Sequence, residues 1–573
     1  MTTTTSNADS KPTASLADLM KAAGVLNAPA WFEQILIPHW PFNHQMDAIK
    51  AYPNHTRYGD FSEPGTGKTM PAQVHAILMA ALGNKVVFTM PPKLIRQFIA
   101  EFREFFPGID DHLVIDHLDR GAVQKSKLIA RWDKEDSWPD ILLISYDAFR
   151  QFNDRAQVRV VPRTQWKLPP ELWEDPAVPE NYWTRNAEGE QVPRYEDATP
   201  HTKHGDPIVA RKGKYKAKNR EQMRLKNTGY NVYFFDEAHA LCNPEARVWK
   251  GVEAMDMDMG DEVAMYLMTG TPVPTHLHNV YGLIRIINRG AYFSKANFER
   301  KHCIIEREPF KQYLGYKDED AIHRALYKNA RRVQKRDVTD LPESLVSVTP
   351  IRLAGAHKKL YDQILLERFA VLGDQVLAPD NDSALRMLAL RLISCPDEYD
   401  SSGKIGKDNE LTKWMDQIVD SVNPAERKLI IFAYFKPTVR FLAQRYAKWN
   451  PAVMNGATTK GWAEVERFKK DDTCRVFVVN WGSGGAGLNL QVAHHSAFYE
   501  VPTSPKDAKQ AMARTDRTGQ REACNFYFPR VIGTLFDKNF KNLLKNERSN
   551  NLVVRDKHDL LYDQLKVTKR KCA

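Results

Sequence analysis

The sequence predicts an α/β fold in which one chain forms two lobes, each built on a parallel sheet. Short apolar runs alternate with segments of helical period in two separate series. Continuous apolar runs are typical of parallel strands that are buried on both faces. The runs are 85–89, 141–144 and 232–235 in the first series, and 429–432, 476–479 and 497–499 in the second. The length of 573 residues also exceeds what one hydrophobic core holds.

The chain divides into five expected parts and one insertion. In order, the parts are a tail with a small helical element (1–38), the first lobe (39–290), a helical connecting region (291–400), the second lobe (401–545) and a basic tail (546–573). Residues 150–228 are rich in Pro, Trp, Tyr and charge, so we expect an insertion in the first lobe. Its stretch 203–226 holds nine Lys/Arg against two acids, which fits either a solvated linker or a nucleic-acid contact.

The composition narrows the class of protein. The net charge is +11, from 82 basic and 71 acidic residues, which suits a polyanionic partner. None of the six cysteines has Cys-x-x-Cys spacing, so neither a zinc ribbon nor a disulfide framework is indicated. No apolar run approaches the length of about 20 residues that a membrane helix needs, and no leader sequence is recognisable. We therefore expect an intracellular protein, neither secreted nor bound to a membrane.

A glycine-rich loop near the start of the chain points to nucleotide chemistry. Residues 62–69 read Ser-Glu-Pro-Gly-Thr-Gly-Lys-Thr. Glycines let backbone N–H groups approach phosphates, and the following helix N-terminus favours negative charge. The lysine is expected to reach the β- and γ-phosphates, and the last hydroxyl to ligate Mg²⁺. The nucleotide-binding candidates are Gly65, Thr66, Gly67, Lys68 and Thr69.

Two acids far downstream supply what the loop lacks. Asp236 and Glu237 come directly after the apolar run 232–235. The carboxyl ends of parallel strands meet at one edge of a sheet, so these acids are expected beside the phosphate loop. Asp236 would hold Mg²⁺, and Glu237 would orient the attacking water. A solvated helix start is the alternative interpretation of Asp-Glu-Ala-His.

Together, these segments resemble the superfamily 2 helicases and translocases, and in particular their Swi/Snf-like branch with a DEAH-box motif. The resemblance covers roughly residues 40–530, and its motifs occur in the order of the family. Besides the loop and the acids, the segments that carry it are Asn243, Leu267–Pro272, Arg331-Arg332 with Lys335 and Leu341–Glu343, Ser402–Lys404, Gly484–Leu490, and Gln510–Gln520. The resemblance implies two RecA-like lobes with an ATP site in the cleft between them.

The sequence departs from the family pattern at several positions. Ser62 replaces the usual first glycine of the loop, and Asp516 stands where the family usually has His. Residues 503–505 read Thr-Ser-Pro instead of Trp-Asn-Pro, and Thr275 occupies the place of a frequent Asn. These departures bear on substrate details and on nucleosome-type remodelling, and not on ATP turnover.

The resemblance implies roles for further residues. Arg517 would be the arginine finger, with Arg514 beside it; the alternative is a solvated helix face. Gln45 resembles the glutamine that reads adenine, although a surface glutamine is the plainer interpretation. Gly487 and Asn489 would lie at the nucleotide. The implied cofactors are ATP and Mg²⁺.

Candidates for nucleic-acid contact follow only from the resemblance. Small residues and backbone N–H groups suit contact with a phosphate backbone, which positions a strand without reading its sequence. The candidate segments are 91–93, 145–147, 455–456 and 483–489.

We therefore expect an ATP-dependent DNA translocase or helicase that moves on, or remodels, duplex or branched DNA. The first alternative is a strand-separating DNA or RNA helicase, since RNA is not excluded. The second is a nucleic-acid-binding scaffold with an inactive ATPase. A bacterial or viral setting fits the compact sequence better than a chromatin remodeller. A monomer is compatible with the sequence, which does not fix the oligomeric state.

Overall fold

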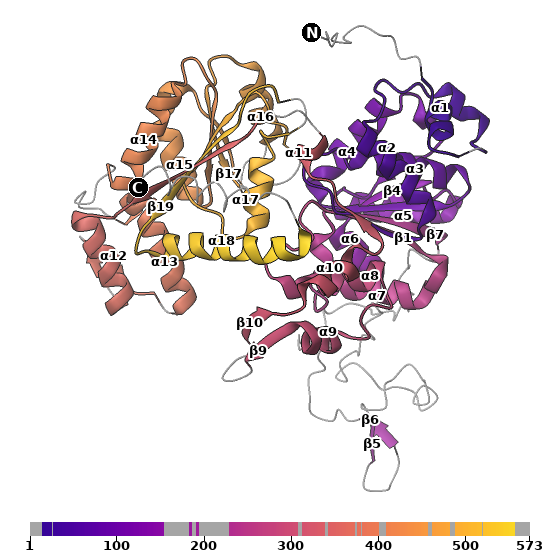
Figure 1. Ribbon diagram of the computed structural model, residues 1–573, viewed down its shortest axis with the longest axis horizontal. Helices are drawn as coiled ribbons and strands as arrows, with labels where there is room; N and C mark the ends of the chain where they lie inside the picture. The colour runs from indigo at the N-terminus through magenta and orange to yellow at the C-terminus, as the bar shows by residue number, and fades with distance from the viewer. Residues whose placement is uncertain are drawn as a thin grey trace.

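The computed structural model describes residues 14–25, 27–153, 183–185, 191–193, 228–306, 312–338, 342–368, 370–372, 375–379, 381–399, 408–455, 461–481, 488–517 and 520–555. Two lobes lie side by side, the first indigo to magenta and the second orange in Figure 1. Each lobe contains one parallel sheet with helices on both faces. The predicted fold class is confirmed.

The first lobe is built on a seven-stranded parallel sheet in the order β11-β1-β8-β7-β2-β4-β3. Alternate residues of β2 enter different cores: Val87 packs in one cluster, while Val86 and Phe88 pack in the other. The strands are β1 (Arg57–Asp60), β2 (Lys85–Met90), β3 (Ile115–His117), β4 (Ile141–Ser145), β7 (Tyr230–Asp236), β8 (Ala264–Met268) and β11 (Ala330–Arg331). The three runs predicted for this lobe correspond to β2, β4 and β7.

Helices cover both faces of the first sheet. The main ones are α2 (Asn43–Ala51), α3 (Thr69–Ala81), α4 (Pro92–Phe105), α5 (Ala122–Glu135), α6 (Tyr146–Asn153), α7 (Arg247–Met259) and α8 (Tyr281–Ile287). The predicted small N-terminal helical element comprises α1 (Leu16–Ala22) and a 3₁₀ turn (Ala30–Gln34), and its apolar side joins the core of the lobe.

The second lobe is built on a six-stranded parallel sheet in the order β12-β19-β18-β15-β17-β16. The strands are β12 (Leu345–Ile351), β15 (Leu429–Ala433), β16 (Ala452–Met454), β17 (Val476–Asn480), β18 (His495–Phe498) and β19 (Asn525–Val531). The helices around it are α12 (Gly355–Glu367), α13 (Asp382–Ser394), α14 (Glu410–Val422), α15 (Lys436–Arg445), α16 (Gly461–Lys470) and α17 (Pro505–Met512). The three predicted runs correspond to β15, β17 and β18.

The region expected to be a helical connection, 291–400, contributes to both sheets. β11 completes the first sheet at its edge, and β12 forms the edge of the second. Between and around them lie α9 (Lys295–His302), the hairpin β9 (Cys303–Glu306) and β10 (Gln312–Tyr316), α10 (Glu319–Tyr327) and α11 (Lys335–Val338). The second lobe therefore takes its edge strand from a segment that the sequence alone suggested to be helical.

One long helix, α18 (Leu535–Val554), crosses from the second lobe to the first (yellow in Figure 1). Phe540 and Leu543 pack in a core of the second lobe, whereas Val553 and Val554 pack in a core of the first. The carbonyl of Val553 lies 2.6 Å from Nδ1 of His323 on α10. The expected start of the tail at residue 546 therefore falls inside this helix.

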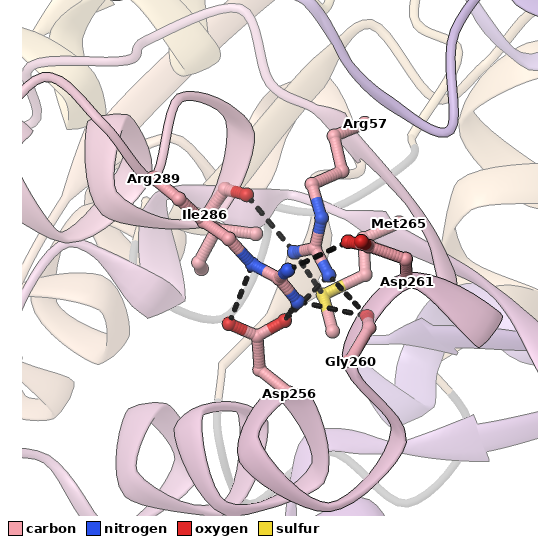
Figure 2. A network of polar contacts seen from close by, with 7 residues as sticks. All are labelled: Arg57, Asp256, Gly260, Asp261, Met265, Ile286 and Arg289. Atoms are coloured by element: carbon pink, nitrogen blue, oxygen red, sulfur yellow. Dashed lines mark hydrogen bonds and ion pairs between the residues drawn. The ribbon is translucent and has the colours of Figure 1, made fainter.

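A polar network closes the amino end of the strands of the first sheet (Figure 2). Arg57 at the start of β1 and Arg289 after α8 both pair with the carboxylate of Asp256 on α7. Both arginines also donate to the carbonyl of Gly260, at 3.1 and 2.8 Å. This network satisfies the charges at the end of the sheet opposite the phosphate loop.

Two further predictions, the insertion at 150–228 and the lack of a membrane helix, can be compared with the structure only over the described residues. Of the expected insertion, the structure describes the end of α6, residue 228 and a hairpin of β5 (Trp183–Arg185) and β6 (Gln191–Pro193); the basic stretch 203–226 lies outside. Among the described helices, none has the length and apolar character needed to cross a membrane.

Candidate active site

The phosphate loop connects the carboxyl end of β1 to the start of α3. Gly65 and Gly67 have φ angles of +86° and +77°, which L side chains rarely adopt. A Cβ at Gly67 would lie 2.3 Å from Nε2 of Gln45, so a larger residue would displace the Gln45 amide from the loop. Thr69 is the first residue of α3, and the loop therefore presents backbone N–H groups and a helix N-terminus to the same space.

Lys68 lies folded over the loop. Its Nζ donates to the carbonyl oxygens of Ser62 and Glu63, at 2.7 and 2.9 Å. Burial lowers the pKa of Lys68, while Asp60, Glu237 and Asp236 oppose that effect. The ammonium group of Lys68 thus lies near three carboxylates, at a place where phosphate oxygens could replace its present hydrogen-bond acceptors.

Asp236 and Glu237 lie at the carboxyl end of β7, next to the loop. Burial, and then the charge of Glu237, raises the pKa of Asp236. For Glu237, burial acts upward, but the hydrogen bond from His239 and the charges of His239, Lys68 and Arg514 outweigh it, and the pKa falls. Neighbouring carboxyls with opposite pKa shifts are typical of functional sites.

The backbone of the second acid is held in an unusual conformation. Glu237 has φ +52° and ψ +45°, which a non-glycine residue adopts at a cost of about 1–3 kcal/mol. Neighbouring contacts maintain it: Tyr146 donates from its hydroxyl to the carbonyl of Asp236 at 2.7 Å, and His239 lies 3.3 Å from the hydroxyl of Thr269. Tyr146, a candidate for nucleic-acid contact, thus supports the acids with its hydroxyl.

The second lobe reaches the same space. Nε2 of Gln510 on α17 donates to Oε1 of Glu237 at 3.3 Å. Arg514 and Arg517 follow α17 in the turns after Met512, rather than on one helix face as a solvated pair would. Burial lowers the pKa of Arg514 to about 10 and that of Arg517 in the same direction, with Glu237 and Glu101 opposing. Both guanidinium groups therefore sit among acids inside the cleft.

The residues from both lobes line one cavity of about 180 Å³. Those that bear on the chemistry are Gly65, Gly67, Lys68, Thr69, Glu101, Asp236, Glu237, Gln510, Arg514 and Arg517. Residues about 450 positions apart in the sequence thus face one another across the cleft.

This arrangement fits a magnesium nucleotide. The loop would hold phosphates through N–H groups and Lys68. Thr69 and Asp236 present a hydroxyl and a carboxylate, which are oxygen ligands of the kind Mg²⁺ prefers. The positive φ angles at Gly65 and Gly67 and the buried cations around the cavity fit phosphate rather than an apolar ligand.

The other predicted nucleotide-binding residues differ in their positions. Gln45, in the first turn of α2, donates to the carbonyl of Gly67 at 3.1 Å and accepts from the N–H of Phe42 at 2.9 Å, so it lies on the loop. Asn489 accepts from the N–H of Gln491 at 3.3 Å and, within the described residues, does not line the cavity. Gly487 lies outside the described residues.

The candidates for nucleic-acid contact that the structure describes lie at carboxyl ends of strands. Pro91 and Lys93 follow β2, Ser145 ends β4, and Asn455 follows β16. Residues 456 and 482–487 are outside the described part. The candidates that can be placed therefore share the edge of each sheet at which the cleft opens.

Sequence analysis placed Arg332 and Lys335 in a family motif without predicting their contacts to the phosphate loop and the second lobe. Arg332 lies 3.8 Å from the carboxylate of Glu63, and Lys335 donates from its backbone N–H to the same carboxylate at 2.9 Å. Lys335 also pairs with Asp516 of the second lobe. The motif that holds Arg332 and Lys335 was visible in the sequence, but nothing in its spacing indicates the partners.

Comparisons with known proteins agree on the kind of protein. The family model described as SNF2-related domain matches residues 61–394, which is more than half of the chain. The model described as helicase conserved C-terminal domain matches residues 410–519. The two matches correspond to the first lobe with the connecting region, and to most of the second lobe.

Curated relatives are distant in sequence. The CHD3-type chromatin-remodeling factor PICKLE of Arabidopsis thaliana is 23% identical over 360 residues, which cover 59% of this chain and 25% of that protein. The uncharacterized ATP-dependent helicase YqhH of Bacillus subtilis is 23% identical, over 52% of this chain and 55% of that protein. The DNA repair and recombination protein RAD54-like of Gallus gallus is 22% identical, over 59% and 50%. The matches span between a quarter and about half of these relatives.

Among solved structures, the Sulfolobus solfataricus SWI2/SNF2 ATPase core in complex with dsDNA matches 90% of this chain and 92% of that chain. The sequence identity is 14% and the TM-score is 0.35.

Proposed function

This chain belongs to the SNF2-related family, and from that premise we propose that it is an ATP-dependent motor that moves along or remodels DNA. The observation that carries the proposal is the cavity that Lys68, Asp236 and Glu237 of one lobe share with Arg514 and Arg517 of the other. A site divided between lobes makes hydrolysis depend on their closure, and this dependence is what a motor requires.

The residues have separate roles in this proposal. When bound, Mg-ATP supplies the γ-phosphoryl group that is transferred to water. The loop and Lys68 bind the phosphates, and Thr69 with Asp236 ligates the metal. Glu237 accepts a hydrogen bond from the attacking water and orients it. Arg517, with Arg514 beside it, stabilises the charge that develops on the transferred group.

The proposed substrate is DNA, duplex or branched. Two relatives are named for chromatin remodelling and for DNA repair and recombination. The net charge of +11 suits a phosphate backbone. The described candidates Lys93, Ser145 and Asn455 lie at the edge where both sheets open, so opening and closing of the cleft would shift the grip of each lobe on the strand.

The deciding experiment measures ATP hydrolysis by the full chain with duplex, single-stranded and forked DNA and with RNA, alongside a strand-displacement assay. We expect DNA to stimulate hydrolysis. Stimulation by duplex without displacement supports a translocase, and displacement favours a strand-separating helicase. Preferential stimulation by RNA moves the substrate to RNA. A chain that binds DNA but never hydrolyses ATP would be the inactive scaffold.

Lys68→Ala tests the site itself. The variant should lose turnover by about 10²-fold or more, because a cation that stabilises the transition state is removed, while DNA affinity stays near that of the wild type. Wild-type turnover in this variant would contradict the proposed role of the loop.

A further inference from the structure

An ion pair joins the two lobes beside the phosphate loop. Nζ of Lys335, at the start of α11, lies 2.5 Å from Oδ2 of Asp516 and donates to the carbonyl of Asp516 at 2.8 Å. The side chains are 9% and 10% exposed. Two residues 181 positions apart are thus held together by two contacts, away from the screening that weakens surface pairs.

The same lysine is tied to the phosphate loop. Its backbone N–H donates to Oε2 of Glu63 at 2.9 Å, and the carbonyl of Glu63 accepts from Nζ of Lys68. A Cβ at Gly65 would lie 3.2 Å from Cβ of Arg517 and 3.8 Å from Cδ of Lys335. The loop, the ion pair and the arginine finger therefore form one continuous set of contacts.

Asp516 is well placed to set the position of the finger. It directly precedes Arg517, so whatever fixes its backbone carbonyl and carboxylate also fixes the start of the Arg517 side chain. The N–H of Leu490 bonds the carbonyl of Arg514 at 3.0 Å, which holds the other side of the same turn.

We propose that Lys335 and Asp516 form a positioning pair that holds Arg517 over the phosphate loop and keeps the two lobes closed on each other. The inference rests on the proposed ATPase function, which it deepens. Neither residue touches the reacting atoms in this account; they act through the finger.

The test compares Asp516→Asn and Lys335→Met with the wild type in DNA-stimulated ATP hydrolysis and in small-angle X-ray scattering without nucleotide. Because a displacement of the finger by about 1 Å can cost up to 10²-fold, kcat should fall about 10- to 100-fold while KM for ATP changes less than about twofold. Each variant should also show a larger radius of gyration. The double variant should be no worse than the worse single one, because one interaction is lost in all three.

Asp537→Asn is the matched control. Asp537 is 4% exposed and pairs with Arg530 and Lys541, both on elements of the second lobe, so the substitution should change neither the radius of gyration nor the ratio of kcat to KM. Unchanged scattering and unchanged kcat in Asp516→Asn would overturn the inference. If the wild type does not hydrolyse ATP, the proposed function fails, and the scattering comparison still decides whether the pair holds the lobes.

A second inference comes from an aromatic pair at the carboxyl edge of the second sheet. Tyr434 and Trp481 directly follow β15 and β17, where Ala433 and Asn480 are paired. Their rings are stacked, with centroids 4.8 Å apart at 26°. Tyr434 remains 43% exposed, so aromatic surface is available at the edge where the cleft opens.

The protein holds this pair in place. The carboxylate of Glu500, which is 2% exposed, accepts from the backbone N–H groups of Tyr434 and Phe435. The amide of Asn480 donates to the carbonyl of Tyr434. A buried carboxylate and an amide thus fix the turn that presents the ring, which limits the entropy lost when a ligand stacks on it.

Cations extend from the pair along α15. Lys436 and Arg440 are exposed, and no ion pair of either is found among the described residues. They line a groove of about 510 Å³ that reaches Asn455, a candidate for nucleic-acid contact. Two like charges four residues apart on a helix repel each other, and a phosphate backbone would relieve that repulsion.

We infer that this edge binds a DNA strand with unpaired bases, which stack on Tyr434 while their phosphates follow Lys436 and Arg440. Stacking on aromatic side chains beside a positive groove is how proteins bind single strands without reading sequence, whereas a duplex hides the faces of its bases. The inference rests on the proposed action on DNA and specifies which DNA the second lobe binds.

The test measures equilibrium binding of the full chain to a thymidine oligonucleotide, to an abasic strand of equal length and to a duplex. Tyr434→Ala should weaken binding of the thymidine strand about tenfold, since stacking carries base affinity, and should leave the other two within about twofold. Tyr434→Phe should bind like the wild type. Phe293→Ala, which removes a 95% exposed aromatic from elsewhere on the surface, is the control.

Reversing the charges with Lys436→Glu and Arg440→Glu together should lower the affinity for all three nucleic acids and reduce the salt dependence of binding. Equal wild-type affinity for the abasic and thymidine strands would overturn the inference, as would equal losses on all three ligands in Tyr434→Ala. A chain that binds none of the three would instead contradict the proposed action on DNA.

Discussion

The two ends of β1 show how the same types of side chain serve two purposes. At its amino end, Arg57 shares the carboxylate of Asp256 with Arg289, and it also donates to the carbonyls of Ile286 and Gly260. At its carboxyl end, Asp60 is followed by the phosphate loop, where cations and acids converge on a cavity. The first set of charges is satisfied within one lobe, whereas the second set comes from two lobes.

The charges at the amino end of β1 therefore serve stability, and those at its carboxyl end serve the proposed function. At the amino end, both arginines donate to the carboxylate of Asp256, and backbone carbonyls accept from the same arginines, so these charges pair with one another. In the cleft, by contrast, Lys68 donates to loop carbonyls that phosphate oxygens can replace, and Arg514 and Arg517 face acids from the other lobe. Substitutions at the amino end should therefore change the free energy of unfolding, and those at the carboxyl end should change turnover.

Glu237→Gln should lower turnover strongly. The amide keeps the size of the side chain but cannot accept a proton from the attacking water, so kcat should fall by about 10²–10⁴-fold. The midpoint of thermal unfolding should move little, because the residue is not part of the hydrophobic core. Steady-state hydrolysis with DNA and a thermal melt check both statements, and a variant that retains wild-type kcat would remove Glu237 from the proposed mechanism.

Asp256→Ala should disrupt the network at the amino end of β1 and lower the free energy of unfolding. It leaves two largely buried arginines without their shared partner, which costs about 3 kcal/mol in the free energy of unfolding. KM for ATP should not change. Asp261→Ala is the matched control, because Asp261 pairs with the same Arg289 but its side chain is 99% exposed; its loss should cost less than about 1 kcal/mol. Equal costs in urea unfolding would contradict this account of the network.

Buried His75 in the first lobe should make a smaller contribution, which is a pH dependence of the free energy of unfolding. Burial lowers the pKa of His75 to about 3, below the ordinary value of 6.5. Between these two pH values the unfolded chain binds a proton that the native chain does not, so stability is lost as pH falls below about 6.5. From pH 7 to pH 5 the loss from this residue is about 2 kcal/mol.

His75→Phe should remove that loss while keeping a ring against Tyr52. The measurement is the difference in the free energy of unfolding between pH 7 and pH 5 for both proteins. If both lose the same amount, His75 does not titrate on unfolding as described.

The sequence predicts most of the strands, because those buried on both faces are continuous apolar runs. It missed β12 for a physical reason: as an edge strand it includes Ser347, Thr349 and Pro350, and only Val346 and Ile351 of its seven residues are buried. β11 was missed because it has two residues. Such strands depend on their neighbours more than on their own composition.

The candidate site also has a part that the sequence predicts and a part that it does not. The loop and the acids could be recognised because neighbouring residues carry their chemistry. The contacts from Lys335 to Asp516 and from Gln510 to Glu237 join residues 181 and 273 positions apart. No spacing rule predicts them, since they exist only after the lobes have met.

The most direct test of the central claim, a site completed by the second lobe, is Arg517→Ala in the full chain, with Arg521→Ala as an exposed neighbouring control. DNA-stimulated kcat and the affinity for a fluorescent ATP analogue are measured on both. We expect Arg517→Ala to lower kcat by about 10³-fold or more while nucleotide affinity stays within about threefold, and we expect Arg521→Ala to change neither. A kcat of Arg517→Ala close to that of the wild type would contradict a site shared between two lobes.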